Sequence, residues 1–554
     1  MKKGPSEKGF FFKAFIGLLT AFSAYLLYST FQESTTSASP SDLRDQIETV
    51  FLDSWNDYKT YAWGYDVYHP LSHQKSNMYG SNGKPLGWII VDALDTIMLM
   101  YNSTQTHKQE FANEIQLVET WINDVLDYDI DVSVSIFETT IRMLGGLLSG
   151  YYLSKELQVG NPDIYLNKAI DLADRLLPAF DATSTGIPYS SINLHTGESV
   201  KNHVDDGASS TAEFTTLQLE FKYLSAITGD PAYWEAAEAV YTPLYEENDL
   251  LHTFHGLVPI YVYPDNAKFH GQNIRLGSRG DSFYEYLLKQ YLQTHEPVYY
   301  KLYRQSMEGM KQFLLAKSEP SGLVFIGERE HGLYGPLSPK MDHLVCFMGG
   351  LLAMGATEGL QISKAREQPF WDTKHEEDWN LAKSLTRTCY EMYHQVPSGL
   401  ASEIVVFNKG NSFRPNYWKS SKGDFFIKPA DTHNLQRPET VESIMFLYHL
   451  TKDQKYRDWG REIFQSFRIH TSVNCQGPNK NCVFTSLSDV ISKPTKKGDN
   501  LESFWLAETL KYLYLLFLDD VDLSSVVFNT EAHPFPVLPG ELLTQKKLFT
   551  GWSI

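Results

Sequence analysis

The sequence predicts an all-α fold, an (α/α)7 barrel of alternating inner and outer helices. Apolar helical runs that open with an acidic residue recur seven times, and a more amphipathic helix precedes each of them. Apolar residues ring most of the acid-headed helices, so these should be buried on nearly all sides. Each helix pair must cover the apolar face of its neighbour, either in an open solenoid or in a closed ring. Because the acid-headed helices are too apolar to line an open groove, we expect a closed barrel with these helices inside.

The expected elements follow one another in pairs along the chain. The outer helices should occupy residues 43–62, 111–128, 165–180, 232–247, 298–317, 376–395 and 455–471. The inner helices should open near Asp92, Glu138, Glu213, Glu285, Asp342, Glu442 and Glu508. Segments rich in Gly, Pro, Asn and Ser favour loops with short strands that build the rim of a pocket. These loops are expected at 72–87, 183–209, 396–437 and 472–500.

The composition is that of a large, acidic, folded protein. The chain has 554 residues, of which 42% are hydrophobic, and this supports a large core and excludes wholesale disorder. Its formal net charge of −19 argues against a nucleic-acid partner, because such a partner needs a basic surface that displaces counterions. Four cysteines are too few for a disulfide scaffold in so long a chain. We therefore expect a small molecule or a glycan as the ligand.

The amino terminus predicts a membrane anchor. Residues 14–31 carry no charge and nearly span the hydrocarbon of a bilayer at about 1.5 Å per residue. Lysines upstream favour a cytosolic tail over 1–13, so the rest of the chain should be luminal. A Ser/Thr-rich stem over 32–42 would join the anchor to a single luminal domain over 43–554. The alternative is a signal peptide that is cleaved among the small residues at 34–39.

Two further features are compatible with a lumen. The sequon at Asn102 would accept an N-linked glycan. Cys475 and Cys482 bracket a polar loop, which a disulfide would close. Cys346 and Cys389 lie in apolar helical segments and are either buried thiols or a bridge between two helices.

Acidic residues at the starts of buried helices point to chemistry. A single one could simply cap its helix, because a carboxylate satisfies free N–H groups and the helix dipole. Seven of them, on inner helices that run the same way, would gather at one end of the barrel. Packing carboxylates together is costly unless a cation or a polyhydroxylated ligand compensates. The sequence therefore predicts a sugar site, and calcium is the cation that suits an oxygen-rich site in a lumen.

Arginines and aromatic residues would complete this sugar site. Three arginines stand close in sequence to an acidic residue: Arg142 after Glu138, Arg279 before Asp281 and Arg437 before Glu439. They would supply counter-charge and rigid donor forks. The aromatic rings of Phe504, Trp505 and Trp418 would cover the C–H faces of pyranose rings. Two carboxylates with separated pKa values would then cleave a glycosidic bond, one giving a proton and the other activating water.

Motifs for competing chemistries are absent from the sequence. It contains no GxSxG elbow, no phosphate-binding GxxxxGK[ST] loop, no HExxH and no CxxC. His343, His433 and His533 are isolated, and we expect each to be a hydrogen-bonded histidine of the core or the rim.

Seven motifs, in order along the chain from about Leu43 to Ile554, resemble those of glycoside hydrolase family 47. They are GWIIVDALDT (87–96), FETTIRMLGG (137–146), GSRGDSFYEYLLKQYL (277–292), SPKMDHLVCFMGG (338–350), LQRPETVESI (435–444), ESFWLAETLKY (502–512) and VFNTEAHPF (527–535). The resemblance implies an (α/α)7 barrel whose floor is plugged by a C-terminal hairpin. It also implies a calcium-dependent, inverting hydrolase that trims terminal α1,2-linked mannose from N-glycans.

The resemblance assigns roles to individual residues. Glu138 or Asp281 would protonate the leaving oxygen, and Glu439 would be the general base that activates water. Thr530 would contact calcium through its carbonyl and hydroxyl oxygens. The other calcium ligands would be waters held by Glu442, Glu508 and Glu531. Substrate contacts would come from Asp92, Arg142, Glu213, Arg279, Glu285, Glu403, Arg437, Glu442, Phe504 and Glu508.

Arg279 indicates the subclass. Endoplasmic-reticulum members of the family resemble this chain in having arginine there, whereas Golgi members usually have leucine. Its donor fork would pin one glycan branch, so the resemblance implies removal of mainly one mannose from Man9GlcNAc2 to give a Man8 isomer. The paired cysteines of the family match Cys346 and Cys389, which implies a disulfide.

The expected protein is thus a monomeric, single-pass type II enzyme of the endoplasmic-reticulum membrane that acts on high-mannose N-glycans of glycoproteins. One alternative is a glycan-binding quality-control factor on the same fold. Another is a helical-repeat scaffold without activity, which would leave the acidic cluster without a purpose.

Overall fold

The computed structural model describes residues 38–79, 83–410, 414, 416–475 and 481–553, and this part of the chain is mainly helical, as predicted. Within these ranges, every helix is too short or too polar to cross a membrane. The predicted anchor over 14–31 and its cytosolic tail lie outside the described residues.

Long amphipathic helices alternate with buried ones along the chain. The amphipathic helices are α2 (Pro40–Ala62), α5 (Lys108–Asp124), α8 (Pro162–Leu176), α11 (Ala232–Ala239) with α12 (Tyr241–Glu246), α15 (Pro297–Phe313), α18 (Thr373–His394) and α20 (Gln454–Thr471). The buried segments are α3 (Trp88–Asp92) with α4 (Leu94–Ser103), α6 (Ile136–Glu138) with η1 (Thr139–Leu144) and α7 (Gly145–Leu157), α9 (Thr211–Phe214) with α10 (Gln218–Thr228), α14 (Asp281–Thr294), η4 (His343–Phe347) with α16 (Met348–Thr357), α19 (Glu439–Thr451), and η6 (Trp505–Thr509) with α21 (Leu510–Leu516).

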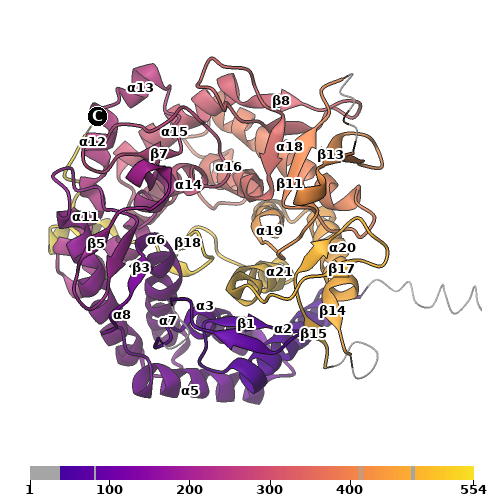
Figure 1. The fold of residues 1–554 in the computed structure, drawn as a ribbon, viewed down its shortest axis with the longest axis horizontal. Helices are drawn as coiled ribbons and strands as arrows, with labels where there is room; N and C mark the ends of the chain where they lie inside the picture. The colour runs from indigo at the N-terminus through magenta and orange to yellow at the C-terminus, as the bar shows by residue number, and fades with distance from the viewer. Residues whose placement is uncertain (1–37, 80–82, 411–413, 415, 476–480, 554) are drawn as a thin grey trace, which may run out of the picture.

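The buried helices form a ring. Contacts run from α4 to α7, and then through α10, α14, α16, α19 and α21, and η6 returns the ring to α4. Each amphipathic helix packs on the outside of one member of this ring, α5 on α4, α15 on α14 and α18 on α16 among them. Figure 1 shows these helices arranged around a central space.

The burial of each helix follows its sequence pattern. All ten residues of α16 are buried, because neighbours cover it on every side. In α15 the buried residues, such as Tyr299, Leu302 and Met310, recur at helical spacing, and the remaining face is polar. The difference between an apolar and an amphipathic run therefore sorts the helices into an inner and an outer layer.

The first helix begins earlier than the sequence interpretation placed it. We expected a stem through residue 42, but α2 starts at Pro40. Ser39 caps it, because the Ser39 side chain accepts from the Asp42 N–H while the Asp42 carboxylate accepts from the Ser39 N–H. This reciprocal cap, with proline in the first turn, starts a helix inside a segment that looks like a linker.

Short antiparallel strands occupy the loops. The sheets are β1 (Val67–His69) with β2 (Gln74–Ser76); β3 (Ser133–Ser135), β4 (Ser191–Asn193) and β5 (Ser199–Val200); β6 (Ser209–Ser210) with β7 (Tyr261–Val262); β8 (Leu315–Lys317) with β9 (Val324–Ile326); β10 (Lys340–Asp342), β11 (Ile404–Phe407), β13 (Phe425–Ile427) and β12 (Trp418–Lys419); β14 (Ser472–Val473) with β15 (Val483–Phe484); and β16 (Leu487–Asp489) with β17 (Lys496–Lys497). The remaining helical turns are η2 (Leu177–Asp181), η3 (Asp205–Gly207), α13 (Leu250–Thr253), α17 (Ile362–Ala365), η5 (Pro429–Asp431) and α22 (Gly540–Lys546).

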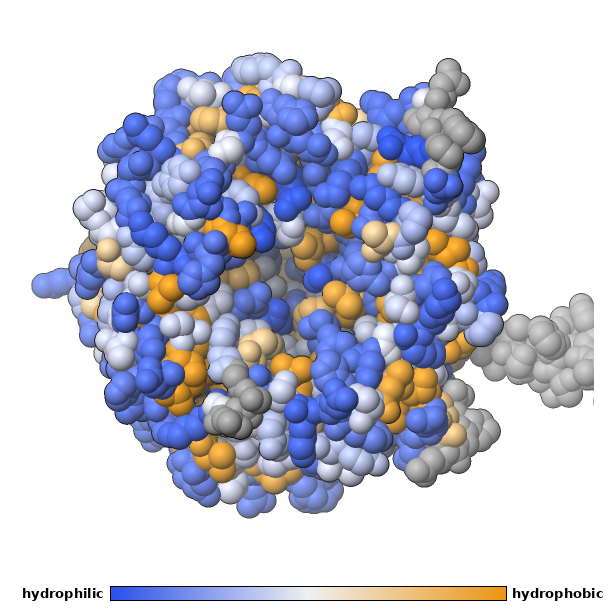
Figure 2. Space-filling view, in the orientation of Figure 1, coloured by the Kyte–Doolittle hydropathy of each residue, from blue (hydrophilic) through white to orange (hydrophobic). Residues whose placement is uncertain are grey.

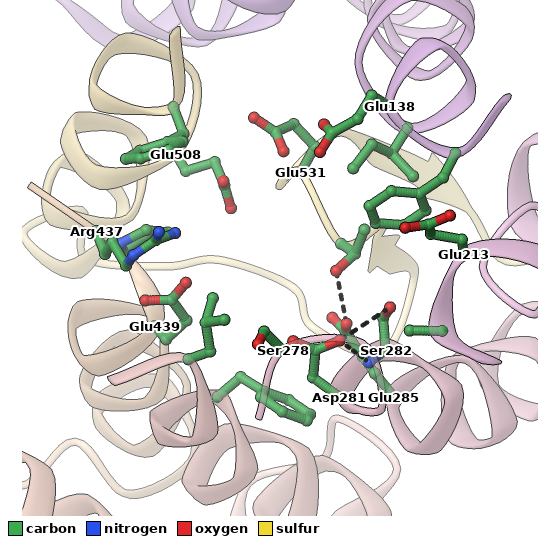
Figure 3. Close-up of a pocket in the computed structure, with 18 of the residues that line it drawn as sticks. Glu138, Glu213, Ser278, Asp281, Ser282, Glu285, Arg437, Glu439, Glu508 and Glu531 are labelled. Carbon is green, nitrogen blue, oxygen red and sulfur yellow. Dashed lines mark hydrogen bonds between the residues drawn. The ribbon is translucent and has the colours of Figure 1, made fainter. Parts of the chain in front are cut away.

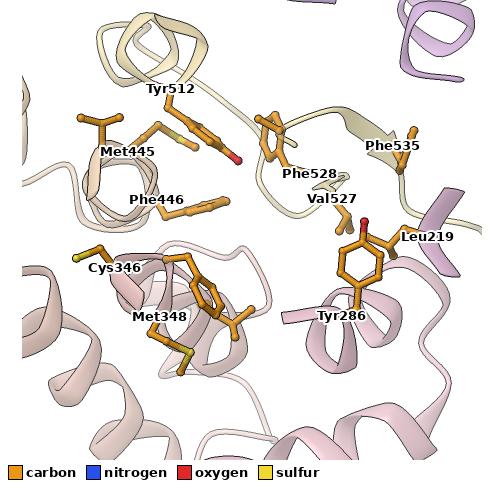
Figure 4. Packing of buried hydrophobic residues seen from close by; sticks show 14 of the residues in the cluster. Leu219, Tyr286, Cys346, Met348, Met445, Phe446, Tyr512, Val527, Phe528 and Phe535 are labelled. Atoms are coloured by element: carbon orange, nitrogen blue, oxygen red, sulfur yellow. The ribbon is translucent and has the colours of Figure 1, made fainter. Parts of the chain in front are cut away.

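A C-terminal hairpin, β18 (Val526–Phe528) with β19 (Pro534–Pro536), packs against the inner helices. The Phe528 ring lies 6.2 Å from that of Phe446 on α19 and 5.8 Å from that of Tyr512 on α21. Figure 4 shows these rings together, with Phe535 on the far side of the hairpin. This packing holds the hairpin tip, residues 529–533, against the buried helices of the ring.

Both cysteine pairs are disulfides. Cys346 on η4 is bonded to Cys389 on α18, which ties an inner helix to its outer partner. Cys475 and Cys482 close their own short loop. Asn102, in the predicted sequon, is exposed in the last turn of α4.

Candidate active site

A cavity of about 270 Å³ opens at the end of the ring where most inner helices begin. Figure 2 shows it as a hollow near the middle of one face. Most of the residues predicted for the site line it: Glu138, Arg142, Glu213, Arg279, Asp281, Glu285, Arg437, Glu439, Glu442, Phe504, Glu508, Thr530 and Glu531. Figure 3 shows Arg437 and Glu439 on one side, Glu138 and Glu213 opposite, and Asp281 and Glu285 at the edge between them.

Two predicted residues lie behind the cavity wall. Asp92 is fully buried and accepts from His533 Nε2 at 3.1 Å and from Arg142 at 3.4 Å. Glu403 accepts from the backbone N–H of Leu435 at 3.1 Å and is ion-paired with Arg437. Both carboxylates therefore orient an arginine that itself lines the cavity. The sequence interpretation missed the apolar and hydroxyl residues of the wall: Phe137, Ile141, Ser210, Ala212, Ser278, Ser282, Leu344, Phe347 and Pro438.

Glu439 is held as a carboxylate by His343. Glu439 begins α19, and its Oε2 lies 2.7 Å from His343 Nδ1. His343 Nε2 in turn lies 2.9 Å from the Tyr393 hydroxyl and 3.0 Å from the Thr440 hydroxyl. Burial would raise the pKa of Glu439, but the His343 hydrogen bond and the charges of His343 and Arg437 lower it below its usual value. Glu439 is thus ionised at neutral pH, and His343 is the hydrogen-bonded core histidine that we expected.

Asp281 has the opposite electrostatic environment. It begins α14, and its Oδ1 accepts from the backbone N–H of Ser282 at 2.8 Å. Burial raises the pKa of Asp281 to about 7, and the negative charges of Glu285, Asp342 and Glu439 add to the shift. Two carboxyl groups of one cavity therefore differ in protonation near neutral pH, which is the arrangement that general acid–base catalysis needs.

Glu138 lies across the cavity and is bound to Arg142. The two form an ion pair one helical turn apart, with Arg142 Nε 2.8 Å from Glu138 Oε2. Arg142 also pairs with Glu531 on the hairpin and packs 5.9 Å from the ring of Phe504. The backbone here, η1, is a π-helix, and so is η6 beside Phe504. Such single-turn widenings inside helices are frequent at functional sites, because they shift side chains out of the regular helical register.

The floor of the cavity is rich in buried carboxyl groups. Thr530, at the hairpin tip, donates its hydroxyl to Glu285 Oε2 at 2.7 Å, and Glu285 is ion-paired with Lys289. Burial, with neighbouring carboxylates contributing, raises the pKa of Glu442 to about 8 and that of Glu508 well above its usual value. Within the described ranges, no cluster of three or more His, Cys, Asp or Glu side chains is placed to hold a metal directly. The hydroxyl and carboxyl groups named here offer oxygen, the ligand type that hard cations prefer.

The direct ion pairs of two arginines were not predicted. Arg279 and Arg437 stand two residues before Asp281 and Glu439, and we expected them to supply counter-charge there. Arg279 Nη1 instead lies 3.2 Å from Asp205. Arg437 is ion-paired with Glu403, and its charge also lowers the pKa of Glu439, as expected. Both ion pairs form because each arginine precedes the helix start, so its side chain extends toward a different loop.

Two of the three aromatic assignments were wrong. Phe504 lines the cavity, as predicted. Trp505 is fully buried and donates its indole N–H to Ser54 Oγ at 3.1 Å on the outer helix α2. Trp418 lines a separate surface hollow with Asn416 and Asp489. Successive residues of a helix point in different directions, and here Phe504 faces the cavity whereas Trp505 points toward α2.

His533 lies in a buried network of charged side chains. His533 Nδ1 is 2.7 Å from Asp95 and its Nε2 is 3.1 Å from Asp92, and all three side chains are fully buried. Lys511 Nζ completes the network at 2.8 Å from Asp95. His433 is partly exposed on the rim, where its carbonyl accepts from the Glu403 N–H.

Comparisons with known proteins place the chain in a family. Residues 50–537 match the model of glycosyl hydrolase family 47. An endoplasmic reticulum mannosyl-oligosaccharide 1,2-alpha-mannosidase of Saccharomyces cerevisiae is 64% identical over 97% of this chain and 98% of its own length. A protein of that description from Schizosaccharomyces pombe is 44% identical over 92% and 93%. The solved alpha-1,2-mannosidase from Trichoderma reesei shares 25% identity over 90% of this chain and 99% of its own, with a TM-score of 0.74. The chain belongs to glycosyl hydrolase family 47.

Proposed function

We propose that this protein is a mannosyl-oligosaccharide 1,2-α-mannosidase that removes terminal α1,2-linked mannose from high-mannose N-glycans of glycoproteins. The activities of its relatives and the match over nearly the full chain support this activity. The cavity supports it independently, because carboxylates, arginines and one aromatic face surround a space of sugar size. The fold we propose for it is the (α/α)7 barrel, in which the hairpin β18–β19 plugs the floor.

The observation that carries the proposal is the contrast between Glu439 and Asp281. Glu439, with its lowered pKa, accepts a proton from water and directs that water at the anomeric carbon. Asp281, with a pKa of about 7, holds the proton that the leaving oxygen needs. Glu138 is the alternative donor, and it is ion-paired with Arg142 across one helical turn. Direct attack by water, without a covalent sugar intermediate, inverts the anomeric configuration.

Calcium is the cofactor we propose for the floor of the cavity. Thr530 would hold it through its carbonyl and hydroxyl oxygens, and Glu442, Glu508 and Glu531 would orient its waters. When bound, the ion supplies positive charge and coordination for sugar hydroxyls. The donor set supports this choice, because Thr530 and the acidic side chains of the floor offer oxygen and the carboxyl groups outnumber their cationic partners.

Arg279 supports a preference for one glycan branch. It lines the cavity and keeps 39% of its side chain exposed, so its guanidinium can reach beyond the reacting sugar. We therefore propose that Man9GlcNAc2 loses mainly one mannose and yields one Man8 isomer. The proposed setting is the endoplasmic-reticulum membrane, with residues 14–31 as a type II anchor, a luminal catalytic domain and a monomeric enzyme.

The test is turnover of Man9GlcNAc2 by the full chain in detergent, with and without a calcium chelator, followed by analysis of the product isomers. Loss of one mannose, stopped by the chelator and restored by calcium, is the expected result. Loss of several mannoses would refute the branch preference but would still support the proposed hydrolase activity. Binding of the glycan by calcium-loaded protein without cleavage would refute the hydrolase and favour a glycan-binding factor.

A further inference from the structure

Arg279 is held by its surroundings in an unusual backbone conformation. Its φ is +75°, a left-handed value that non-glycine residues rarely adopt. The Arg279 carbonyl accepts from the Ala212 N–H at 3.0 Å and from the Ser210 hydroxyl at 3.3 Å. Because two donors from one segment, Ser210 and Ala212, hold this carbonyl, the point from which the side chain leaves is well defined.

Two side chains then set the direction of the guanidinium. Arg279 Nη1 lies 3.2 Å from Asp205 Oδ2, and Cζ lies 5.0 Å from the centre of the Tyr261 ring. The ring covers one face of the guanidinium, and the carboxylate takes one edge of it. The exposed 39% of the side chain is left to face a ligand at the cavity mouth.

Asp205 and Tyr261 are themselves positioned by one small ribbon. Strands β6 and β7 pair with Ser210 opposite Tyr261, and the turn η3 that carries Asp205 leads directly into β6. Asp205 Oδ2 also accepts from Asn202 Nδ2 at 3.1 Å, which holds the carboxylate before any ligand arrives. Burial and a hydrogen bond to Asp205 raise the pKa of Tyr261, so the tyrosine is a neutral partner. The ribbon therefore holds Asp205 and Tyr261 beside Arg279 on the rim of the cavity.

The Glu213 carboxyl is a second acidic group that interacts electrostatically with Arg279. Glu213 lies in the cavity wall, and its pKa is about 7, raised by burial and lowered in part by the charge of Arg279. An arginine that lost Asp205 would be drawn toward Glu213, into the cavity rather than toward its mouth. An unrestrained arginine would also lose side-chain rotamer entropy when it met a ligand.

We propose that Asp205 and Tyr261 are positioning residues for glycan-branch choice, because they hold the Arg279 guanidinium at the cavity mouth. This inference rests on the proposed function and extends it. Both residues act through Arg279 and leave the acid and base of the reaction untouched. One glycan branch can accept hydrogen bonds from the preorganised Arg279 guanidinium. Other branches cannot align with this fixed charged group and bind less well.

The test compares product isomers from Man9GlcNAc2, together with kcat and KM, for the full chain and its variants. The variants are Asp205→Ala, Asp205→Glu, Tyr261→Ala, Arg279→Leu and the double variant Asp205→Ala with Arg279→Leu. Asp206→Ala is the matched control, since Asp206 belongs to the same turn and its side chain is 81% exposed. Turnover of an α1,2-linked mannose disaccharide by each variant shows that the catalytic carboxylates are still assembled.

We expect Asp205→Ala to broaden the product isomers in the direction of Arg279→Leu and to raise KM for Man9GlcNAc2 about two- to fivefold, the range for a partly exposed ion pair. Tyr261→Ala should act in the same direction, Asp205→Glu should restore much of the selectivity, and Asp206→Ala should match the wild type. The double variant should equal Arg279→Leu alone, because Asp205 acts only through that arginine.

A single, unchanged isomer from Asp205→Ala, while Arg279→Leu broadens the products, would overturn the positioning role and leave the proposed function intact. Additive effects in the double variant would also overturn it. Unchanged isomers from Arg279→Leu would refute branch choice by the arginine itself. An inactive wild type would refute the proposed function, and the inference with it.

Discussion

Replacing Glu442 by glutamine should make the calcium-free protein more stable at neutral pH. Glu442 lies in the first turn of α19 and is 7% exposed. Burial raises its pKa to about 8 from 4.5; Lys289 opposes the shift, and the charges of Glu285 and Glu439 add to it. Glutamine keeps the size and the polar contact with Tyr512 but cannot ionise.

The magnitude follows from proton linkage. Between pH 4.5 and pH 8 the unfolded chain ionises Glu442 while the folded protein keeps the proton, so stability falls as pH rises through this window. At pH 7 the loss amounts to about 3 kcal/mol, because each tenfold difference in proton affinity between the two states is worth ~1.4 kcal/mol. Below pH 4.5 both states hold the proton, and the loss vanishes. For a domain of this size, about 3 kcal/mol corresponds to a rise in Tm of roughly 3 °C.

The assay is thermal unfolding of the wild type and Glu442→Gln at pH 4.5 and pH 7 in chelator. The variant should melt about 3 °C higher at pH 7 and at the same temperature at pH 4.5. Added calcium should narrow the difference, because a cation favours the ionised wild-type side chain. The exposed Glu367→Gln is the control and should change neither value. If Glu442→Gln is no more stable than the wild type at pH 7, the pKa of Glu442 is not raised in the folded protein.

The remaining predictions concern catalysis and the disulfides. Glu439→Gln should lower kcat at least about 100-fold with an unchanged melting curve, because only the general base is lost. Turnover within tenfold of the wild type would show that Glu439 is not the general base. The kcat/KM of the wild type should fall as pH rises through about 7, where Asp281 loses its proton, and persistence of this limb in Asp281→Asn would assign it to another group. Cys346→Ser should lower the free energy of unfolding by about 4 kcal/mol, because its bridge closes a separation of 43 residues. Cys475→Ser should lower it by about 2 kcal/mol, because its bridge closes a separation of only 7. Equal losses in denaturant unfolding would contradict this dependence on loop length.

Several site residues were predictable because their positions depend on local pattern. Glu138, Asp281 and Glu439 each stand at the start of a buried helix segment. Once inner helices pack side by side in one direction, their starts meet at one end, and the acids meet with them. The family motifs then distinguished these residues from acids that merely cap a helix.

Other features were unpredictable because they depend on contacts between distant segments. Nothing near Glu439 in sequence indicates that His343 will bind it, since the two come from different inner helices. The pairing of Arg279 with Asp205 arises in the same way, through a ribbon whose strands are separated by a long stretch of chain. Asp92 matched a family motif, yet only the packing of the C-terminal hairpin placed it behind the wall, against His533.

By itself, the sequence determined which helices are buried, which acids head them and which family the motifs resemble, because apolar periodicity and short motifs are local properties of the chain. The tertiary structure alone decided which charges neutralise one another, which carboxyl keeps its proton and which side chains reach the cavity. Those outcomes depend on burial and on distances between residues hundreds of positions apart, and electrostatic energies change steeply with both.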